Sequence, residues 1–239
     1  LVELDRMKDD FIRVAAHELK TPVAIMKGYA QVLSRAAPGL TEPQRKMLDA
    51  VNRGADRIDR IIGDLLDISR LQLGHLELAR ERVDVHQLVQ EAVDRTAVMN
   101  PKHRIRVVRA TPVVVQGDRD RLQDMTMQLL ENAVKYSPGG GDIDVAVDLL
   151  NDEATVSVTD HGVGIPRAKQ ARIFERFYRA HTGTPYDYGG MGVGLYIAKE
   201  IIQDHGGRMW FDSEEGHGST FRFSLPVKNA GRSRSRRGR

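Results

Sequence analysis

The chain has 239 residues, of which 41% are hydrophobic and 29% are charged, so it can form a folded core and is not disordered throughout. Its net charge of +3 arises at the C-terminal end, where five of the 36 basic residues lie among the last eight positions; the remaining 31 face 33 acidic residues. This balance excludes a basic nucleic-acid-binding body, and the absence of cysteine excludes disulfides and thiolate metal sites.

The first predicted element is a long helix over residues 1–37, whose apolar side chains recur at helical spacing. The apolar stripe turns polar between His17 and Pro22, and we expect a bend there because Pro22 removes one backbone donor. Thr41 and Gln44 have the spacing of a capping box, which predicts the start of a second helix.

The second helix carries a continuous apolar seam. Its members recur at alternating spacings of three and four, at Leu48, Val51, Ala55, Ile58, Ile62 and Leu65. Because Ile61, Leu66 and Ile68 widen this surface beyond what one antiparallel partner covers, we expect two hairpins to pair as a homodimeric four-helix bundle. In the alternative, these residues pack on the downstream domain. We place the dimerisation hairpin at residues 1–73.

Downstream of a linker predicted at residues 74–82, the pattern becomes mixed. Helical spacing recurs over residues 86–97, 118–136, 167–175 and 192–205. Strand patterns occur over residues 104–108, 113–115, 143–149, 155–158, 209–211 and 220–225. This order indicates an α+β domain at residues 83–227, with helices on one face of a mixed sheet. Residues 228–239 are expected to be a basic disordered tail.

Two segments of this domain carry groups suited to a nucleotide. Asn132 and Lys135 share one helical face, where an amide oxygen can ligate Mg²⁺ and an ammonium can neutralise phosphate. Asp160 ends an apolar strand and precedes Gly162 and Gly164, so its carboxylate could accept a hydrogen bond from the adenine amino group while the glycines allow close approach. Taken singly, each segment is equally compatible with a solvated helix face or a tight turn.

A third segment, Gly190, Gly192 and Gly194, opens a predicted helix. Backbone N–H groups at such a helix start lie at the positive end of the helix dipole and can hold phosphate. A flexible loop without a ligand could contain the same glycines. The fixed order of the three segments is much more specific than any one of them.

This order resembles the N, G1 and G2 boxes of the sensor histidine kinases of two-component systems. The string IFERFYR at residues 173–179 is similar to their F box, and HELKTP at residues 17–22 is similar to their H box. The resemblance covers nearly all of residues 4–226. It implies a Bergerat-type ATP-binding α/β sandwich, an enzyme that phosphorylates its own histidine from ATP with Mg²⁺, and a response regulator as partner.

The resemblance assigns the phosphoryl chemistry to residues of the first helix. His17 would be the phosphoacceptor, and the neighbouring Glu18 would orient the imidazole and take its proton. Thr21 lies one helical turn after His17, and in the family this arrangement goes with dephosphorylation of the regulator. In the alternative, the Thr21 hydroxyl merely bonds a backbone carbonyl.

The resemblance also assigns the nucleotide contacts. Asn132 would ligate Mg²⁺, Asp160 would bind adenine, and Gln128 stands where many members carry a second metal-binding Asn. The further expected nucleotide contacts are Lys135, Tyr136, Gly162, Gly164, Phe174, Arg176, Phe177, Arg179, Gly190, Gly192, Gly194 and Leu195. Among them, Phe174 and Phe177 would anchor a lid over residues 177–191.

Two other functions fit parts of the sequence. A gyrase-like or chaperone-like ATPase would use Glu131 to activate water, but the histidine-bearing hairpin would then have no purpose. A non-catalytic dimeric scaffold would bind nucleotide or a receiver without transferring phosphate. The two are distinguished from a kinase by whether acid-labile phosphate appears on His17.

The sequence contains neither an apolar run of transmembrane length nor a signal peptide. We expect this part to be cytoplasmic, with no specific nucleic acid partner. Because the apolar pattern runs to Leu1 and no Met precedes it, we interpret the chain as a fragment. Any membrane anchor would lie in the missing upstream segment.

Overall fold

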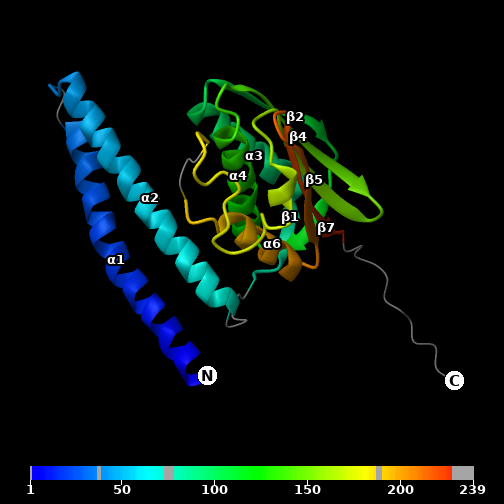
Figure 1. Cartoon of the computed structure of the whole chain (residues 1–239), viewed down its shortest axis with the longest axis horizontal. Coiled ribbons are helices and arrows are strands. Elements are labelled where there is room, and N and C mark those ends of the chain that lie inside the picture. The colour runs from blue at the N-terminus through cyan, green and yellow to red at the C-terminus, as the bar shows by residue number, and fades with distance from the viewer. Residues whose placement is uncertain (1, 37–38, 73–77, 187–189, 228–239) are drawn as a thin grey trace. The chain divides into compact units, whose positions relative to one another are not determined.

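The structure is a computed structural model. It describes residues 2–36, 39–72, 78–186 and 190–227; the side chains of residues 2–14, 17, 35, 36 and 72 lie outside this description. The chain divides into two compact units, Leu1–Leu76 and Glu77–Arg239 (Figure 1). Each unit is described by itself.

The first unit is a helical hairpin of α1 (Val2–Ala36) and α2 (Glu42–Gln72). The predicted capping box is confirmed: the Thr41 N–H donates to Gln44 Oε1 over 2.8 Å, and the Gln44 N–H donates to Thr41 Oγ1 over 3.5 Å. Helix α1 continues through Pro22, although the proline ring removes the N–H that would bond the carbonyl one turn earlier.

The interior of the hairpin is small. Its buried apolar residues are Ala16, Val23, Ala55 and Ile62, with Leu66 packed against them. Of the predicted seam on α2, Ala55 and Ile62 are buried, whereas Val51 and Ile58 remain exposed. One hairpin therefore covers only part of its own apolar surface.

The second unit is built on a mixed five-stranded sheet, in the order β2–β4–β5–β7–β6. Its strands are β2 (His103–Ala110), β4 (Gly141–Leu150), β5 (Glu153–Asp160), β6 (Arg208–Glu214) and β7 (Gly218–Pro226). Only the β2–β4 pair is parallel among these pairings. The helices α3 (Val85–Met99), α4 (Arg119–Lys135) and α6 (Gly194–Asp204) cover one face (Figure 1). The predicted α+β architecture is confirmed.

A two-residue hairpin joins β4 to β5, which correspond to the strand patterns predicted at residues 143–149 and 155–158. Its turn residues Asn151 and Asp152 have φ of 52° and 62°, the left-handed pair that matches the twist of a two-residue hairpin. Alternation along β5 then turns Ala154, Val156 and Val158 toward the helices, where all three are buried.

Three elements differ from the sequence prediction. A short strand, β1 (Glu81–Asp84), pairs with β3 (Val114–Gly117) where a linker was expected in part. The helix expected over residues 167–175 is only α5 (Arg167–Gln170), because the backbone after it forms turns in which each N–H bonds the carbonyl three residues earlier. Helix α6 begins at Gly194 rather than Gly192, because Gly192 has a φ of +74°.

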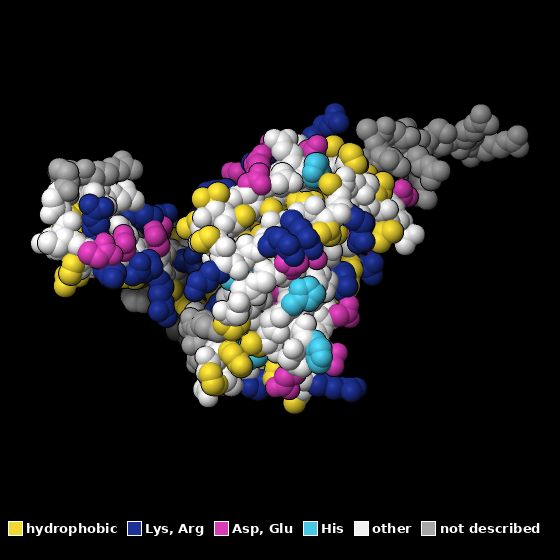
Figure 2. Space-filling view, turned by 90° about the horizontal axis from the view of Figure 1, so that it is seen from above, with side chains coloured by type: hydrophobic (Ala, Val, Ile, Leu, Met, Phe, Trp, Pro, Cys, Tyr) yellow, Lys and Arg dark blue, Asp and Glu magenta, His cyan; other side chains and the backbone are white. Residues whose placement is uncertain are grey.

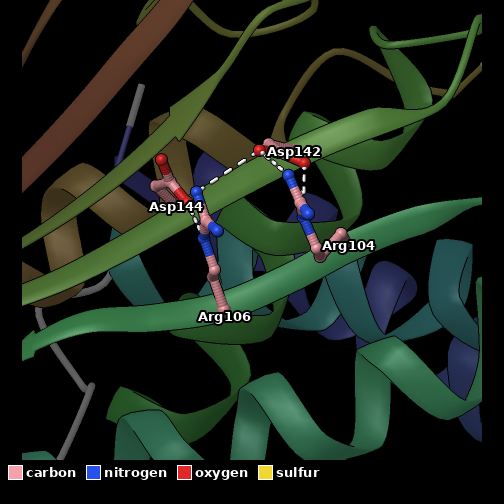
Figure 3. Close-up of polar contacts among 4 residues, drawn as sticks. All are labelled: Arg104, Arg106, Asp142 and Asp144. Carbon is pink, nitrogen blue, oxygen red and sulfur yellow. Dashed lines mark hydrogen bonds and ion pairs between the residues drawn. The ribbon is translucent and has the colours of Figure 1, made fainter.

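The face of the sheet away from the helices carries a ladder of ion pairs (Figure 3). Arg104 on β2 donates from Nε to Asp142 Oδ1 over 2.8 Å and from Nη2 to Asp142 Oδ2 over 2.5 Å, with Asp142 on β4. Arg106 Nε donates to Asp144 Oδ1 over 2.7 Å. Basic and acidic side chains lie close together at several places in Figure 2. Such pairs on an edge strand discourage pairing with another chain, because charged side chains blunt an exposed edge.

Candidate functional site

Helix α4 presents one face to the core and the other to the candidate nucleotide site. Asp118 caps its start by accepting the Arg121 N–H over 3.1 Å. Its buried residues are Leu122, Gln123, Met125, Thr126, Leu129, Leu130 and Ala133. Asn132 and Lys135 are half-buried on the remaining surface, as the predicted spacing requires.

The Asn132 side chain is held in place by a neighbour one turn earlier. Gln128 Nε2 donates to Asn132 Oδ1 over 3.3 Å. The carboxamide oxygen of Asn132 keeps a second lone pair, and an amide oxygen is a hard ligand of the kind that Mg²⁺ takes together with phosphates and water. The described residues contain no group of three or more His, Cys, Asp or Glu that could form a separate metal cage.

Asp160 continues the inward-facing series of β5 and is 5% exposed. Its Oδ1 accepts the N–H of Gly162 over 2.9 Å and the N–H of Ser219 over 3.3 Å. Burial raises the pKa of this carboxyl, and the two backbone donors oppose that effect. The two backbone donors therefore fix the orientation of the carboxyl, while its burial disfavours the ionised form.

Gly162 and Gly164 make close contacts with the protein's own backbone. A β-carbon on residue 162 would lie 2.0 Å from the Tyr136 carbonyl oxygen, and one on residue 164 would lie 1.9 Å from the Glu214 carbonyl oxygen. The Val163 N–H donates to the same Tyr136 carbonyl over 2.9 Å. Gly162 thus docks the loop after Asp160 onto the end of α4, and Gly164 docks it onto the end of β6; the sequence did not predict these roles.

The glycine-rich segment at the start of α6 lies beside α4. A β-carbon on residue 190 would have Lys135 Nζ as its neighbour at 3.8 Å, and one on Gly194 would lie 2.9 Å from Gln128 Cδ. Among the described residues no side chain caps α6, so the N–H groups of its first three residues have neither an intrahelical nor a capping partner there. Three predicted segments are therefore brought together around α4.

The segment at residues 173–179 lies partly in the core. Phe174 packs edge-on against Phe211 at 5.8 Å between ring centroids, and Arg176 stacks over Tyr196 at 4.6 Å. Phe177 has a φ of +61° and is 62% exposed. It therefore does not share the anchoring contacts of Phe174 that were expected of it.

An aromatic cluster that the sequence did not indicate lies at the end of α4. The His181 ring is 5.2 Å from the Tyr136 ring and 6.1 Å from the Tyr186 ring, between centroids. His181 is only 8% exposed. Nothing in the sequence around this single histidine, which lies in a polar loop, indicates that its side chain is buried.

In the other unit, His17, Glu18 and Thr21 lie in α1. The side chain of His17 is outside the described part of the chain, so its predicted exposure stays a prediction. The side chains of Glu18 and Thr21 are exposed, between the buried Ala16 and Val23. Leu195, the last expected nucleotide contact, lies in the first turn of α6 and is half-buried.

Comparisons with known proteins agree with this arrangement. Residues 7–74 match the family described as "His Kinase A (phospho-acceptor) domain", and residues 117–229 match "Histidine kinase-, DNA gyrase B-, and HSP90-like ATPase". A helical hairpin followed by such an ATP-binding fold defines a two-component histidine kinase. The chain belongs to the sensor histidine kinase family.

Individual relatives cover the chain to different extents. It is 32% identical to "Sensor histidine kinase WalK" of Bacillus subtilis (strain 168) over 95% of its own length, but spans only 38% of WalK. The structure of "Mycobacterial sensor histidine kinase MprB" is 30% identical, with a TM-score of 0.56, and covers 61% of this chain and 97% of that one. The crystal structure of full-length ShkA in complex with AMPPNP is 26% identical, with a TM-score of 0.73. The match covers 93% of this chain and 46% of the ShkA chain.

Within the described residues, no helix has the length and apolar character needed to cross a membrane.

Proposed function

We propose that this protein transfers the γ-phosphoryl group of ATP to His17 and then to an aspartate of a response regulator. The observation that carries the proposal is the meeting of three distant segments at α4, where Gly162 contacts Tyr136, Gly190 neighbours Lys135 and Gly194 contacts Gln128. We place the phosphotransfer hairpin at residues 1–73, a linker at 74–82 and the ATP-binding domain at 83–227.

Adenine would be recognised by Asp160. The bonds from Gly162 and Ser219 both end on Oδ1 and orient the carboxylate, whose other oxygen would accept the exocyclic amine. The phosphates would take the uncapped N–H groups at the start of α6. Lys135 lies beside Gly190, and the Arg179 side chain lies beside Gly192, so both can neutralise phosphate charge.

Asn132 would hold Mg²⁺ through Oδ1, because this oxygen accepts a bond from Gln128 with one lone pair and can offer the other to the metal. When bound, Mg²⁺ would neutralise charge on the phosphate oxygens. Gln128 would then act mainly by orienting the Asn132 amide. A direct metal contact from Gln128 Oε1 remains the alternative that its position in the motif suggests.

In the reaction, a ring nitrogen of His17 would attack the γ-phosphorus in line. A nitrogen–phosphorus bond forms, the bond from phosphorus to the β,γ-bridging oxygen breaks, and ADP leaves with that electron pair. Glu18 would take the imidazole proton. Catalysis would come mainly from positioning and charge neutralisation, once the His17 ring and the γ-phosphate are brought within reach of each other.

The exposed apolar side chains of the hairpin support a homodimer. Each is at least 39% exposed: Leu19, Ile25, Met26, Tyr29, Val32, Leu33, Met47, Val51 and Ile58. A patch of this kind marks an interaction surface in a soluble protein, and pairing two hairpins would complete a four-helix bundle.

Thr21 supports a second activity, dephosphorylation of the regulator. Thr21 is an exposed residue one turn after His17 in α1, and its hydroxyl could orient a water toward an aspartyl phosphate. Replacing Thr21 by Ala should then leave autophosphorylation intact and abolish release of phosphate from the regulator.

The proposed activity is tested by incubating the protein with γ-labelled ATP and Mg²⁺. Wild type should acquire acid-labile, base-stable label, and His17→Gln should acquire none. The matched control His86→Gln, which removes another histidine on a different helix, should label like wild type. Phosphate release without labelled protein, abolished by Glu131→Gln, would instead indicate an ATPase.

A further inference from the structure

One buried histidine joins the end of α6 to the start of α4. The Asp118 N–H donates to His205 Nε2 over 2.9 Å, so this ring nitrogen carries no proton. The ring proton lies on Nδ1, which donates to the Ile201 carbonyl oxygen over 2.7 Å. His205 is 6% exposed, and both of its ring nitrogens are thus bonded to backbone groups, one at the start of α4 and one in α6.

The backbone before α4 leaves room for this ring. Gly117 is the last residue of β3 and precedes the cap residue Asp118. A β-carbon on residue 117 would lie 2.8 Å from His205 Cδ2 and 3.0 Å from Leu122 Cδ1. Any larger residue at this position would therefore displace the His205 ring from the Asp118 N–H.

Both sides of the contact are held by the rest of the domain. Asp118 accepts the Ala79 N–H at Oδ2 over 3.0 Å, in addition to capping α4 through Oδ1. The chain after His205 lies close against β7, since a β-carbon on Gly207 would be 1.9 Å from the Ser224 carbonyl oxygen. The His205 contact therefore connects two points that are already fixed.

Apolar packing alone does not define how far α6 lies along α4. Ala198 and Ile202 of α6 belong to the same apolar core as Leu122 and Leu129 of α4. Apolar burial is non-directional, so it favours contact between the helices more than one particular register. The two hydrogen bonds of His205 do select a register, because a hydrogen bond weakens steeply when its distance or angle changes.

The register of α6 matters most at its other end. The helix has 11 residues, so its first N–H groups lie about 16 Å from His205. There, a β-carbon on Gly194 would lie 2.9 Å from Gln128 Cδ, and Gln128 in turn donates to Asn132. A shift of α6 along its axis would change the spacing between these N–H groups and Asn132.

We propose that His205 is a positioning residue for the nucleotide phosphates: by holding the end of α6 on Asp118, it sets the position of the uncapped N–H groups relative to Asn132. This inference rests on the proposed ATP site. Asp160 ends β5, outside both helices, so its position does not depend on the register of α6. Loss of the His205 contact would therefore weaken binding of the phosphates and leave binding of adenine unchanged.

The test compares two ligands of the whole chain, ADP with Mg²⁺ and adenosine, because only ADP carries phosphates. Calorimetry measures the first and an NMR titration the second. His205→Phe keeps a buried ring but neither hydrogen bond, so we expect its Kd for ADP to rise about five- to twentyfold. Its Kd for adenosine should stay within about twofold of wild type. The control His86→Phe, in α3, should bind both ligands like wild type.

Two further variants separate positioning from general damage. His205→Gln keeps an amide oxygen that can accept the Asp118 N–H, and it should bind ADP within about threefold of wild type. Gly117→Ala leaves His205 in place but displaces its ring, and it should reproduce the loss for ADP alone; it replaces His205→Phe if that variant does not fold. Its control is Gly139→Ala, where a β-carbon meets nothing within 4 Å.

Amide chemical shifts of the ligand-free protein give a readout that needs no nucleotide. In His205→Phe the Gly194 N–H signal should move, although it lies about 16 Å away, and the Gly162 signal should not. Equal losses for ADP and adenosine, unchanged ADP binding, or an unmoved Gly194 signal would overturn the inference alone. A wild type that binds no ADP would overturn the proposed function and, with it, the role of His205, even if the Gly194 signal moves.

Discussion

Gly162 lies against Tyr136 so closely that any β-carbon at residue 162 would be 2.0 Å from the Tyr136 carbonyl oxygen. That carbonyl also accepts the Val163 N–H over 2.9 Å. The loop after Asp160 and the end of the Asn132 helix are therefore positioned by one backbone contact, which links the adenine end of the candidate site to its metal end.

Replacing Gly162 by Ala should damage both stability and nucleotide binding. The added methyl group meets backbone that cannot move independently, so we expect a loss of about 1–3 kcal/mol in the free energy of unfolding, and weaker ADP binding as Asp160 shifts. Urea unfolding and calorimetry measure the two effects. The control is Gly139→Ala, where a β-carbon meets nothing within 4 Å; it should change stability by no more than about 0.5 kcal/mol.

Asp160→Asn should separate stability from binding. Because burial raises the pKa of Asp160, this group favours the fold most at a pH below its unfolded pKa, and that contribution is lost as the pH rises through the folded pKa. A neutral Asn, which still accepts N–H bonds, should therefore unfold at an equal or higher urea concentration at pH 7.

The same variant should bind ADP at least about tenfold more weakly, since an amide replaces a charged acceptor for the adenine amine. Calorimetry at pH 7 measures this loss. Unchanged affinity would show that Asp160 does not contact the base.

Local patterns predicted those elements whose signals are contained in a few neighbouring residues. The Thr41–Gln44 capping box formed as expected. Strand β1 could not be found in this way, because its four residues form a strand only by pairing with β3, far along the chain.

The candidate site was predictable in its residues but only partly in its contacts. The spacing of Asn132 and Lys135 determined that they share a helix face, and alternation placed Asp160 with the inward side chains of β5. His181 is buried beside the Tyr136 ring. This is a tertiary contact between segments distant in sequence, and no local pattern encodes it.

Asp64 on α2 should make the hairpin less stable near neutral pH. Burial, together with the charge of Asp67, raises its pKa to about 6 against the opposing charge of Arg60. The contribution of this group to stability is present below its ordinary pKa and is lost as the pH rises through about 6.

We expect Asp64→Asn to stabilise the protein by about 1–2 kcal/mol at pH 8, after allowance for solvent screening. The gain should disappear at pH 4. Thermal unfolding of wild type and variant at both values tests this, with Asp49→Asn, an exposed position on the same helix, as the control. A gain of the same size at both pH values would exclude the titration of Asp64 as its cause.

Charge placed on the exposed apolar face of the hairpin should dissociate the proposed dimer. Ile58 is 39% exposed and Tyr29 is 69% exposed, and a carboxylate or ammonium buried there without a partner is strongly unfavourable. We expect Ile58→Glu and Tyr29→Lys to sediment as monomers at concentrations where wild type is a dimer. Val98→Glu, at an 84% exposed apolar position on α3, should remain dimeric. If the hairpin residues instead pack on the ATP-binding unit, wild type itself will be a monomer, and Ile58→Glu will lower its stability without changing its mass.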